Sequence, residues 1–155
     1  FSQFACEYIA ENNCQIKYKV VMQDEKETGL REVLNLGHTV GRAIETVSDY
    51  QLLHGEAVAI GLVAQAMLSE SFGYMDSEQV ARVVALLEKA GLPTTIPDYI
   101  DRELLVKKLY TDKKVRNGKL RFVLQKGIGD VVEFSPGVFA LAVEEEVARE
   151  IINRM

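Results

Sequence analysis

The segment from residue 55 to residue 72 constrains the fold of this chain more than any other. Its apolar residues fall on every side of a helix instead of forming one stripe, as the run Ala57-Val58-Ala59-Ile60 illustrates. A helix that is apolar all round is normally buried among other elements. Its uncharged stretch, Ala57 to Ser69, is well short of the roughly 20 apolar residues that a membrane-spanning helix needs. We therefore predict a helix at the centre of a helical bundle, and no membrane partner.

Shorter segments with helical spacing precede and follow this central segment. The helices predicted from the spacing of apolar residues cover residues 4–13, 15–22, 30–47, 77–89 and 101–109. The Glu11-Asn12-Asn13 run is expected to separate the first two. Ser77 and Asp101 are the expected caps of the last two, because their side-chain oxygens can accept from free amides of the first turn.

Residues typical of strands replace the helical pattern near the C-terminus. Residues 120–124 and 131–134 are the predicted strands of a hairpin, with turn signals at Asn117-Gly118 and at 127–130. Pro136-Gly137 is expected to start a last helix that runs to the C-terminus. The predicted fold class is therefore mostly α, a helical bundle with one short β-hairpin, in a single domain over residues 1–155.

Composition excludes several classes of protein. The 155 residues are 48% hydrophobic and 26% charged, which excludes a disordered tail or a collagen-like repeat. The net charge of −5 argues against a general nucleic-acid binder. Cys6 and Cys14 are too few for a disulfide framework, and this favours a reducing cytoplasm. The chain begins at Phe1 without a signal-peptide pattern, so we expect it to start within a longer protein.

The two histidines of the chain, His38 and His54, are candidate metal ligands. His38 lies between Gly37 and Thr39, and His54 stands at the start of the central helix. Neutral imidazole is the commonest metal ligand in proteins, although a histidine beside glycines also serves as a structural or capping residue. A catalytic zinc site needs about three protein ligands. The candidates for a third are Glu27, Glu45 and Glu56, none with a diagnostic spacing.

Polar residues recur at helical spacing through the predicted helix 30–47. Arg31, Asn35, His38 and Arg42 stand at positions i, i+4, i+7 and i+11, which would place them on one face. Four polar groups on one stripe of an apolar bundle are costly to bury without partners. The arrangement suits an anionic, oxygen-rich ligand.

The charge of the chain reverses between Lys107 and Lys126. Eight basic residues and the single acid Asp112 give this stretch a net charge of +7. Such a patch would attract a phosphorylated or carboxylated small molecule. Composition alone favours the plainer interpretation, in which these side chains are the solvated edge of a hairpin.

Several separate motifs resemble those of the 3-dehydroquinate synthase family, in the same order and at similar spacing over essentially the whole chain. In chain order they are Lys17-Tyr18-Lys19-Val20-Val21, Asp24-Glu25-Lys26-Glu27-Thr28-Gly29-Leu30-Arg31, Leu34-Asn35-Leu36-Gly37-His38-Thr39, His54-Gly55-Glu56-Ala57-Val58-Ala59-Ile60-Gly61, Asp112-Lys113-Lys114 and Gly118-Lys119-Leu120-Arg121-Phe122-Val123-Leu124. The resemblance implies the C-terminal, mostly helical domain of such an enzyme, without its N-terminal nucleotide-binding domain.

The resemblance also implies a reaction and its cofactors. The family converts 3-deoxy-D-arabino-heptulosonate 7-phosphate to 3-dehydroquinate and phosphate in the shikimate pathway. Tightly bound NAD transiently oxidises an alcohol, and zinc (or cobalt) acts as a Lewis acid. His38 and His54 would be two metal ligands, and the third would be a glutamate that precedes Phe1. The isolated chain is therefore expected to be inactive, and the full-length enzyme is expected to form a homodimer.

The remaining roles implied by the resemblance concern the substrate. Lys17 and Glu27 would be catalytic residues near its hydroxyls and its carboxylate end. Arg31 would pair with the carboxylate, and Asn35 would contact the phosphate. One lysine of the Lys113-Lys114 pair would also bind phosphate.

Arg42 departs from the family pattern, because many members carry a second histidine at this position. Arginine cannot act as a general acid near neutral pH but can bind phosphate through two parallel hydrogen bonds. We therefore predict a phosphate clamp.

Three alternatives remain open from the sequence. Related sugar-phosphate cyclases share the fold and the zinc and NAD chemistry but make other products. A polyol dehydrogenase would also place metal-binding histidines on a helical domain, although the Asp112-Lys113-Lys114 segment and the run from Glu27 to Arg31 favour a cyclase. A non-catalytic helical binding domain could keep the same residues for packing.

Overall fold

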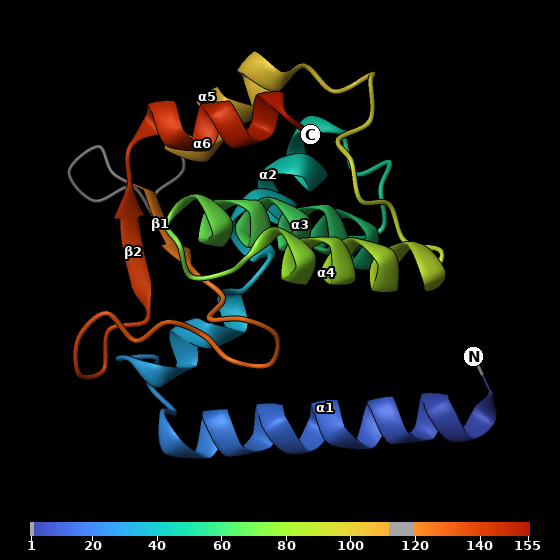
Figure 1. Cartoon of the computed structure of the whole chain (residues 1–155), viewed down its shortest axis with the longest axis vertical. Coiled ribbons are helices and arrows are strands. Elements are labelled where there is room, and N and C mark those ends of the chain that lie inside the picture. The colour runs from blue at the N-terminus through green and yellow to red at the C-terminus, as the bar shows by residue number, and fades with distance from the viewer. Residues whose placement is uncertain (1, 112–119) are drawn as a thin grey trace.

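Helix α3 (His54–Ser71) runs through the middle of the molecule, as predicted for the all-round apolar segment (Figure 1). The computed structural model describes residues 2–111 and 120–155. Helices α2 (His38–Val47), α4 (Ser77–Lys89) and α6 (Glu145–Asn153) contact α3, and α5 (Arg102–Thr111) packs against α2 and α6. In the described part of the chain, no helix is both long and apolar enough to cross a membrane.

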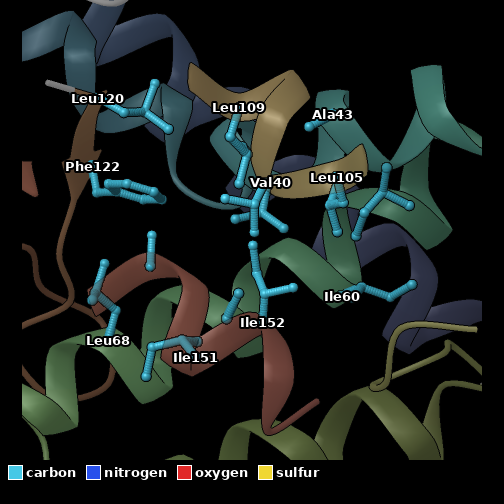
Figure 2. Close-up of a cluster of buried hydrophobic side chains, with 14 of the residues drawn as sticks. Val40, Ala43, Ile60, Leu68, Leu105, Leu109, Leu120, Phe122, Ile151 and Ile152 are labelled. Atoms are coloured by element: carbon cyan, nitrogen blue, oxygen red, sulfur yellow. The ribbon is translucent and has the colours of Figure 1, made fainter. Parts of the chain in front are cut away.

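The core forms where α2, α3, α5, α6 and the sheet meet. Figure 2 shows Val40 of α2 and Ile60 of α3 facing Leu105 of α5 and Ile152 of α6, while Phe122 closes one side from the sheet. Each of these side chains is almost completely buried. Burial of one such side chain stabilises the fold by about 1.5–3 kcal/mol. The packed core around α3 therefore holds the ends of its helices in fixed positions.

Two short strands, β1 (Leu120–Val123) and β2 (Ala140–Val143), form an antiparallel sheet. Leu120 pairs with Val143, and Val123 pairs with Ala140. The fold class is confirmed, but the predicted partner strand, residues 131–134, is wrong. The chain does turn at 127–130, where the Lys126 amide donates to Asp130, yet the returning segment forms only one isolated bridge from Val131.

The Pro136-Gly137 pair forms a turn and does not start a helix, contrary to the prediction. The Val138 amide donates to the carbonyl of Ser135 at 2.8 Å, and Gly137 has a φ of 75°. Proline followed by a residue with positive φ is the signature of a type II turn. The chain then enters β2, and α6 begins only at Glu145. The predicted turn at Asn117-Gly118 lies outside the described residues.

Helix α1 (Gln3–Gln23) is continuous and lies apart from the bundle at the bottom of Figure 1. The predicted break at residues 11–13 is wrong, because the side-chain amides of Asn12 and Asn13 donate to the carbonyls of Tyr8 and Ile9, each at 2.8 Å. These side chains thus bond back onto the helix and do not cap it. None of the residues of α1 is buried, and the helix contacts the short 3₁₀ helix η1 (Leu30–Asn35).

The expected cap of α5 is confirmed and that of α4 is one residue off. Asp101 accepts from the amides of Glu103 and Leu104 at the start of α5. At α4 the cap is Asp76 and not Ser77, because the Asp76 carboxylate accepts from the Gln79 amide at 2.8 Å while the Gln79 side chain accepts from the Asp76 amide at 3.1 Å. This reciprocal pair is a capping box.

Candidate functional site

The segment 30–47, predicted as one helix, is broken into two. The 3₁₀ helix η1 ends at Asn35, Gly37 adopts a left-handed φ of 77°, and α2 begins at His38. The prediction that Arg31, Asn35, His38 and Arg42 share one helical face is therefore wrong. A 3₁₀ helix has three residues per turn, and the left-handed residue changes the direction of the chain before α2 starts.

Close backbone packing explains why the break occurs at Gly37. A Cβ atom placed on Gly61 of α3 would lie 1.9 Å from the carbonyl oxygen of Gly37. No side chain fits in that space, so the turn before α2 rests directly on the backbone of α3. The contact brings the first residue of α2, His38, over the N-terminal half of α3.

The two candidate metal ligands meet as a consequence. The ring centroids of His38 and His54 are 5.3 Å apart. Two imidazoles bound to one tetrahedral metal ion at about 2.1 Å would have centroids roughly 5.2 Å apart. Nδ1 of His38 donates to the Leu36 carbonyl at 2.9 Å, and Nδ1 of His54 donates to the Glu45 carboxylate at 3.1 Å. This leaves Nε2 as the candidate metal-binding atom of each ring, the usual arrangement for histidine ligands.

The carboxylates considered as a third ligand have other partners. Glu45 holds His54, Glu56 accepts from the Leu53 amide at the start of α3, and Glu27 accepts from the side-chain amide of Asn35. Within residues 2–111 and 120–155, no group of three or more histidine, cysteine, aspartate or glutamate residues is placed to hold a metal ion. The described chain therefore offers two candidate metal ligands, and the histidine pair fits a metal only if another ligand joins it.

A cavity of about 510 Å³ opens beside His38. It is lined by residues of the loop before η1, of η1, α2 and α5, and of the two strands. The residues that line it are Lys26, Glu27, Glu32, Asn35, His38, Thr39, Arg42, Ala43, Lys108, Leu109, Leu120, Arg121, Val123 and Ala140. Four basic side chains against two acidic ones make it an attractive place for an anion. Asn35, His38 and Arg42 thus do meet at one cavity, although they come from two helices.

A single buried carboxylate organises the loop that leads into η1. Asp24 accepts from the amides of Thr28, Gly29 and Arg31 at 2.8–2.9 Å and from the Thr28 hydroxyl at 3.0 Å. These hydrogen bonds, led by those from the Thr28 and Arg31 amides, hold the pKa of Asp24 well below its ordinary value.

The loop that Asp24 closes contains a strained residue. Glu27 has a left-handed φ of 56°, uncommon for a residue with a side chain. Its carboxylate lines the cavity and accepts from the Asn35 side-chain amide at 3.2 Å. Backbone strain of this kind is concentrated at functional positions.

The other predicted site residues lie elsewhere. Arg31 is not among the cavity-lining residues of the described chain, and its guanidinium donates to the Glu25 carbonyl at 2.8 Å. Lys17 is exposed on α1. Lys113 and Lys114 lie outside the described residues.

Four charged residues of the cavity were given no individual role from the sequence, although Lys108 and Arg121 belong to the basic stretch that was expected to attract an anionic small molecule. They are Lys26, Glu32, Lys108 and Arg121. Arg121 donates to the Ala140 carbonyl at 2.7 Å and lies 3.7 Å from the Glu32 carboxylate. Its position in a strand between the buried residues Leu120 and Phe122 is the signal for an outward-facing basic residue.

The sequence of the chain matches a known family. A family model described as 3-dehydroquinate synthase C-terminal matches residues 2–115. The 3-dehydroquinate synthase of Pelobacter propionicus is 54% identical over 120 residues, which are 77% of this chain and 33% of that protein. The 3-dehydroquinate synthase of Nostoc punctiforme is 44% identical over 148 residues, which are 95% of this chain and 38% of that protein. The chain thus spans about a third of the length of these relatives.

Solved structures show the same fold. A 2-deoxy-scyllo-inosose synthase complexed with carbaglucose-6-phosphate, NAD⁺ and Co²⁺ superposes with a TM-score of 0.85 at 24% identity, over 99% of this chain and 42% of that one. The 2-epi-5-epi-valiolone synthase of Streptomyces hygroscopicus subsp. jinggangensis, with NAD⁺ and Zn²⁺ bound, gives a TM-score of 0.79 at 22% identity, over 99% of this chain and 41% of that one. Fold, motifs and sequence agree: this chain belongs to the 3-dehydroquinate synthase family and corresponds to its C-terminal domain.

Proposed function

We propose that this chain is the metal- and substrate-binding part of a 3-dehydroquinate synthase, which converts 3-deoxy-D-arabino-heptulosonate 7-phosphate to 3-dehydroquinate and inorganic phosphate with NAD and a divalent metal ion. The observation that carries the proposal is the His38–His54 pair, at metal-binding separation, beside a cavity with an excess of basic side chains. A substrate that bears both a carboxylate and a phosphate matches that excess of positive charge.

His38 and His54 would hold the metal ion through Nε2. The ion, zinc or cobalt, supplies Lewis-acid polarisation of a substrate oxygen when bound. The Leu36 carbonyl and the Glu45 carboxylate fix the rings and keep the proton on Nδ1. A third ligand would come from a part of the protein outside this chain, as would most of the NAD site. The isolated chain would accordingly be inactive.

The cavity residues would recognise the two anionic ends of the substrate. Asn35 and Arg42 would contact the phosphate, together with one lysine of the Lys113-Lys114 pair. Glu27, held by Asn35, would orient substrate hydroxyls, with Lys17 contributing from α1. Arg31 would pair with the carboxylate, and its present hydrogen bond to the Glu25 carbonyl would have to give way to that contact.

Among the residues proposed to bind substrate, Arg42 has a specific kinetic prediction. It is exposed on α2, one helical turn after His38, and lines the cavity. Because it would bind phosphate without donating a proton, Arg42→Ala should mainly raise KM, by about tenfold or more for the loss of a charge-assisted hydrogen bond. Steady-state kinetics of the full-length gene product measure this. An unchanged KM would exclude the phosphate clamp.

The decisive experiment uses the full-length gene product. It should form 3-dehydroquinate from the heptulosonate phosphate, and His38→Ala should abolish both turnover and stoichiometric metal content. Unchanged metal content in His38→Ala would overturn the metal-binding role and favour a non-catalytic binding domain. We also propose that the full-length protein is a homodimer, which sedimentation tests. We propose a cytoplasmic location as well, with which the free thiols of Cys6 and Cys14 are consistent.

A second candidate is a sugar-phosphate cyclase that makes another product. It is favoured by the fold shared with 2-deoxy-scyllo-inosose synthase and by Arg42 in place of the usual histidine. The identity of 44–54% to proteins named 3-dehydroquinate synthase weighs against it. Comparing turnover of the heptulosonate phosphate with that of sedoheptulose 7-phosphate and glucose 6-phosphate separates the two.

A further inference from the structure

Gln65 is a fully buried amide in the middle of the otherwise apolar helix α3. Both ends of its side chain have partners far away in the sequence. Its Oε1 accepts from the backbone amide of Gly37, and its Nε2 donates to the carbonyl of Val123 at 2.7 Å. A buried amide is stable only with such partners, so the side chain has one defined orientation.

The peptide group that Gln65 binds is the one that holds His38. The amide of Gly37 and the carbonyl of Leu36 belong to the same planar peptide unit. That carbonyl accepts the Nδ1 proton of His38 at 2.9 Å. The orientation of the peptide plane therefore sets the position of the carbonyl oxygen and, through it, the direction in which Nε2 of His38 points.

A hydrogen bond to the amide side of a peptide also polarises its carbonyl. A more polar Leu36 oxygen holds the Nδ1 proton more firmly and makes Nε2 a better electron donor to a metal ion. Gln65 thus acts on the histidine twice, through geometry and through charge, without touching it.

We propose that Gln65 is a positioning residue for the metal ligand His38, acting through the Leu36–Gly37 peptide. The inference rests on the metal-binding role of His38 proposed above. The other end of Gln65 contributes by anchoring the amide to the end of β1, where Val123 lines the cavity. The metal side and the strand side of the cavity are therefore tied to the same buried side chain.

Ser69, one turn along α3, provides a matched control. It is also fully buried, and its hydroxyl donates to the Gln65 backbone carbonyl at 2.6 Å and accepts from the Gln125 amide at 2.9 Å. It ties α3 to the segment after β1 in the same manner as Gln65 does. Neither of these two hydrogen bonds involves the Leu36–Gly37 peptide, so removal of the hydroxyl should lower stability without changing the metal site.

The test measures the dissociation constant of Zn²⁺ for the full-length gene product, by competition with a chromophoric chelator. We expect Gln65→Met, which keeps the volume but not the hydrogen bonds, to weaken binding by roughly 10- to 100-fold, the usual effect of removing an indirect partner of a metal ligand. Gln65→Glu, which we expect to be protonated at this fully buried position, keeps an oxygen acceptor for the Gly37 amide and a hydroxyl donor for the Val123 carbonyl, and should recover most of the lost affinity. Ser69→Ala should bind within about twofold of the parent, since its hydroxyl bonds to the backbone of Gln65 and not to the side-chain amide that holds the Leu36–Gly37 peptide.

Cobalt substitution adds a readout that a purely structural role would not move. The visible absorption of bound Co²⁺ reports ligand geometry, so it should change in Gln65→Met and stay unchanged in Ser69→Ala. Thermal unfolding of the apo proteins identifies variants that do not fold.

The outcomes separate this inference from the proposed function. A folded Gln65→Met protein that binds Zn²⁺ like the parent overturns the inference, while loss of binding in His38→Ala still supports the function. If both Gln65 variants fail to fold and Ser69→Ala folds, Gln65 supports the fold and not the ligand, which also overturns the inference. If His38→Ala binds as tightly as the parent, the proposed function fails and the inference with it.

Discussion

The start of α2 and the loop that precedes η1 both face the cavity, yet different forces hold them. The start of α2 is fixed by backbone contact with α3, where Gly37 and Gly61 meet, and by apolar packing beneath it. The loop before η1 buries little apolar surface and is fixed by hydrogen bonds to one carboxylate, Asp24. The start of α2 is therefore sensitive to added volume. The loop before η1 also has a close backbone contact, between Gly29 and the Gly137 carbonyl, but it alone is sensitive to loss of a charge.

The difference matches the chemistry proposed for each side. A pair of metal ligands must keep its separation within a few tenths of an ångström, and backbone packing provides that rigidity. A loop that surrounds a substrate must admit it and then close around it, and a cluster of hydrogen bonds can rearrange more easily than a packed core.

The largest effect is expected from Gly61→Ala. The added Cβ would lie 1.9 Å from the Gly37 carbonyl oxygen, so α2 must shift, and overpacking of this kind costs about 3 kcal/mol or more. Urea unfolding measures the loss, and metal affinity should fall with it. Gly55→Ala is the control, because no heavy atom lies within 4 Å of its Cβ position, and it should be neutral or stabilising by about 0.5–1 kcal/mol. Equal stability of the two variants would contradict the close contact.

Asp24→Asn should impair catalysis without changing metal affinity, unlike Gly61→Ala. It replaces a carboxylate oxygen that accepts backbone amides with a group that cannot accept, so the loop carrying Glu27 loosens. We expect kcat/KM to fall by about ten- to a hundredfold, as for other small misplacements of contact residues, with Zn²⁺ affinity unchanged. Glu25→Gln alters a neighbouring exposed carboxylate and should match the parent. A parallel loss of metal affinity in Asp24→Asn would show that the two sides are not held independently.

The pH dependence of the unfolding free energy should distinguish the loop before η1 from the start of α2. The pKa of Asp24 is lowered in the folded state from an ordinary value of 3.8, so its carboxylate stabilises the fold fully above that value. The contribution declines as the pH falls below about 4 and is lost in stronger acid, as the folded-state carboxyl becomes protonated. The difference in unfolding free energy between parent and Asp24→Asn should therefore shrink from pH 5 to pH 3, measured by urea titration. The penalty of Gly61→Ala should stay constant over the same range, because no titrating group is involved.

Sequence patterns predicted the elements whose cause is local. The all-round apolar pattern from Ala57 to Leu68 identified the central helix, since only a buried helix can carry it. The hairpin failed because a turn signal at 127–130 states where the chain reverses and not which segment pairs with β1. Which segment pairs with β1 depends on how β2 packs against the rest of the core, and a short stretch of sequence does not contain that information.

The candidate site was predictable in part for the same reason. Asn35, His38 and Arg42 all line the cavity, but not for the reason that their spacing suggested, because the predicted helix is broken at Gly37 and they share no helical face. The break follows from the contact with Gly61 on another helix, so periodicity within the segment could not reveal it. Arg121 reaches the cavity from β1, more than 80 residues after His38. Such a non-local contact can be seen only in the folded structure.

The smallest effect on stability is expected from Glu27→Gly, and it tests whether the strain in the loop serves the site. Glycine relieves the left-handed φ of 56° but gains freedom in the unfolded chain, so the free energy of unfolding should change by less than about 1 kcal/mol. The lost carboxylate should nevertheless lower kcat/KM while leaving Zn²⁺ affinity intact. Asp49→Gly is a matched control, because Asp49 has a φ of 52° and is not among the cavity-lining residues of the described chain. It should shift stability by a similar amount and leave kinetics unchanged. If Glu27→Gly keeps the parent kcat/KM, the strain at Glu27 is a property of the turn alone, and the Glu27 carboxylate does not contribute to catalysis.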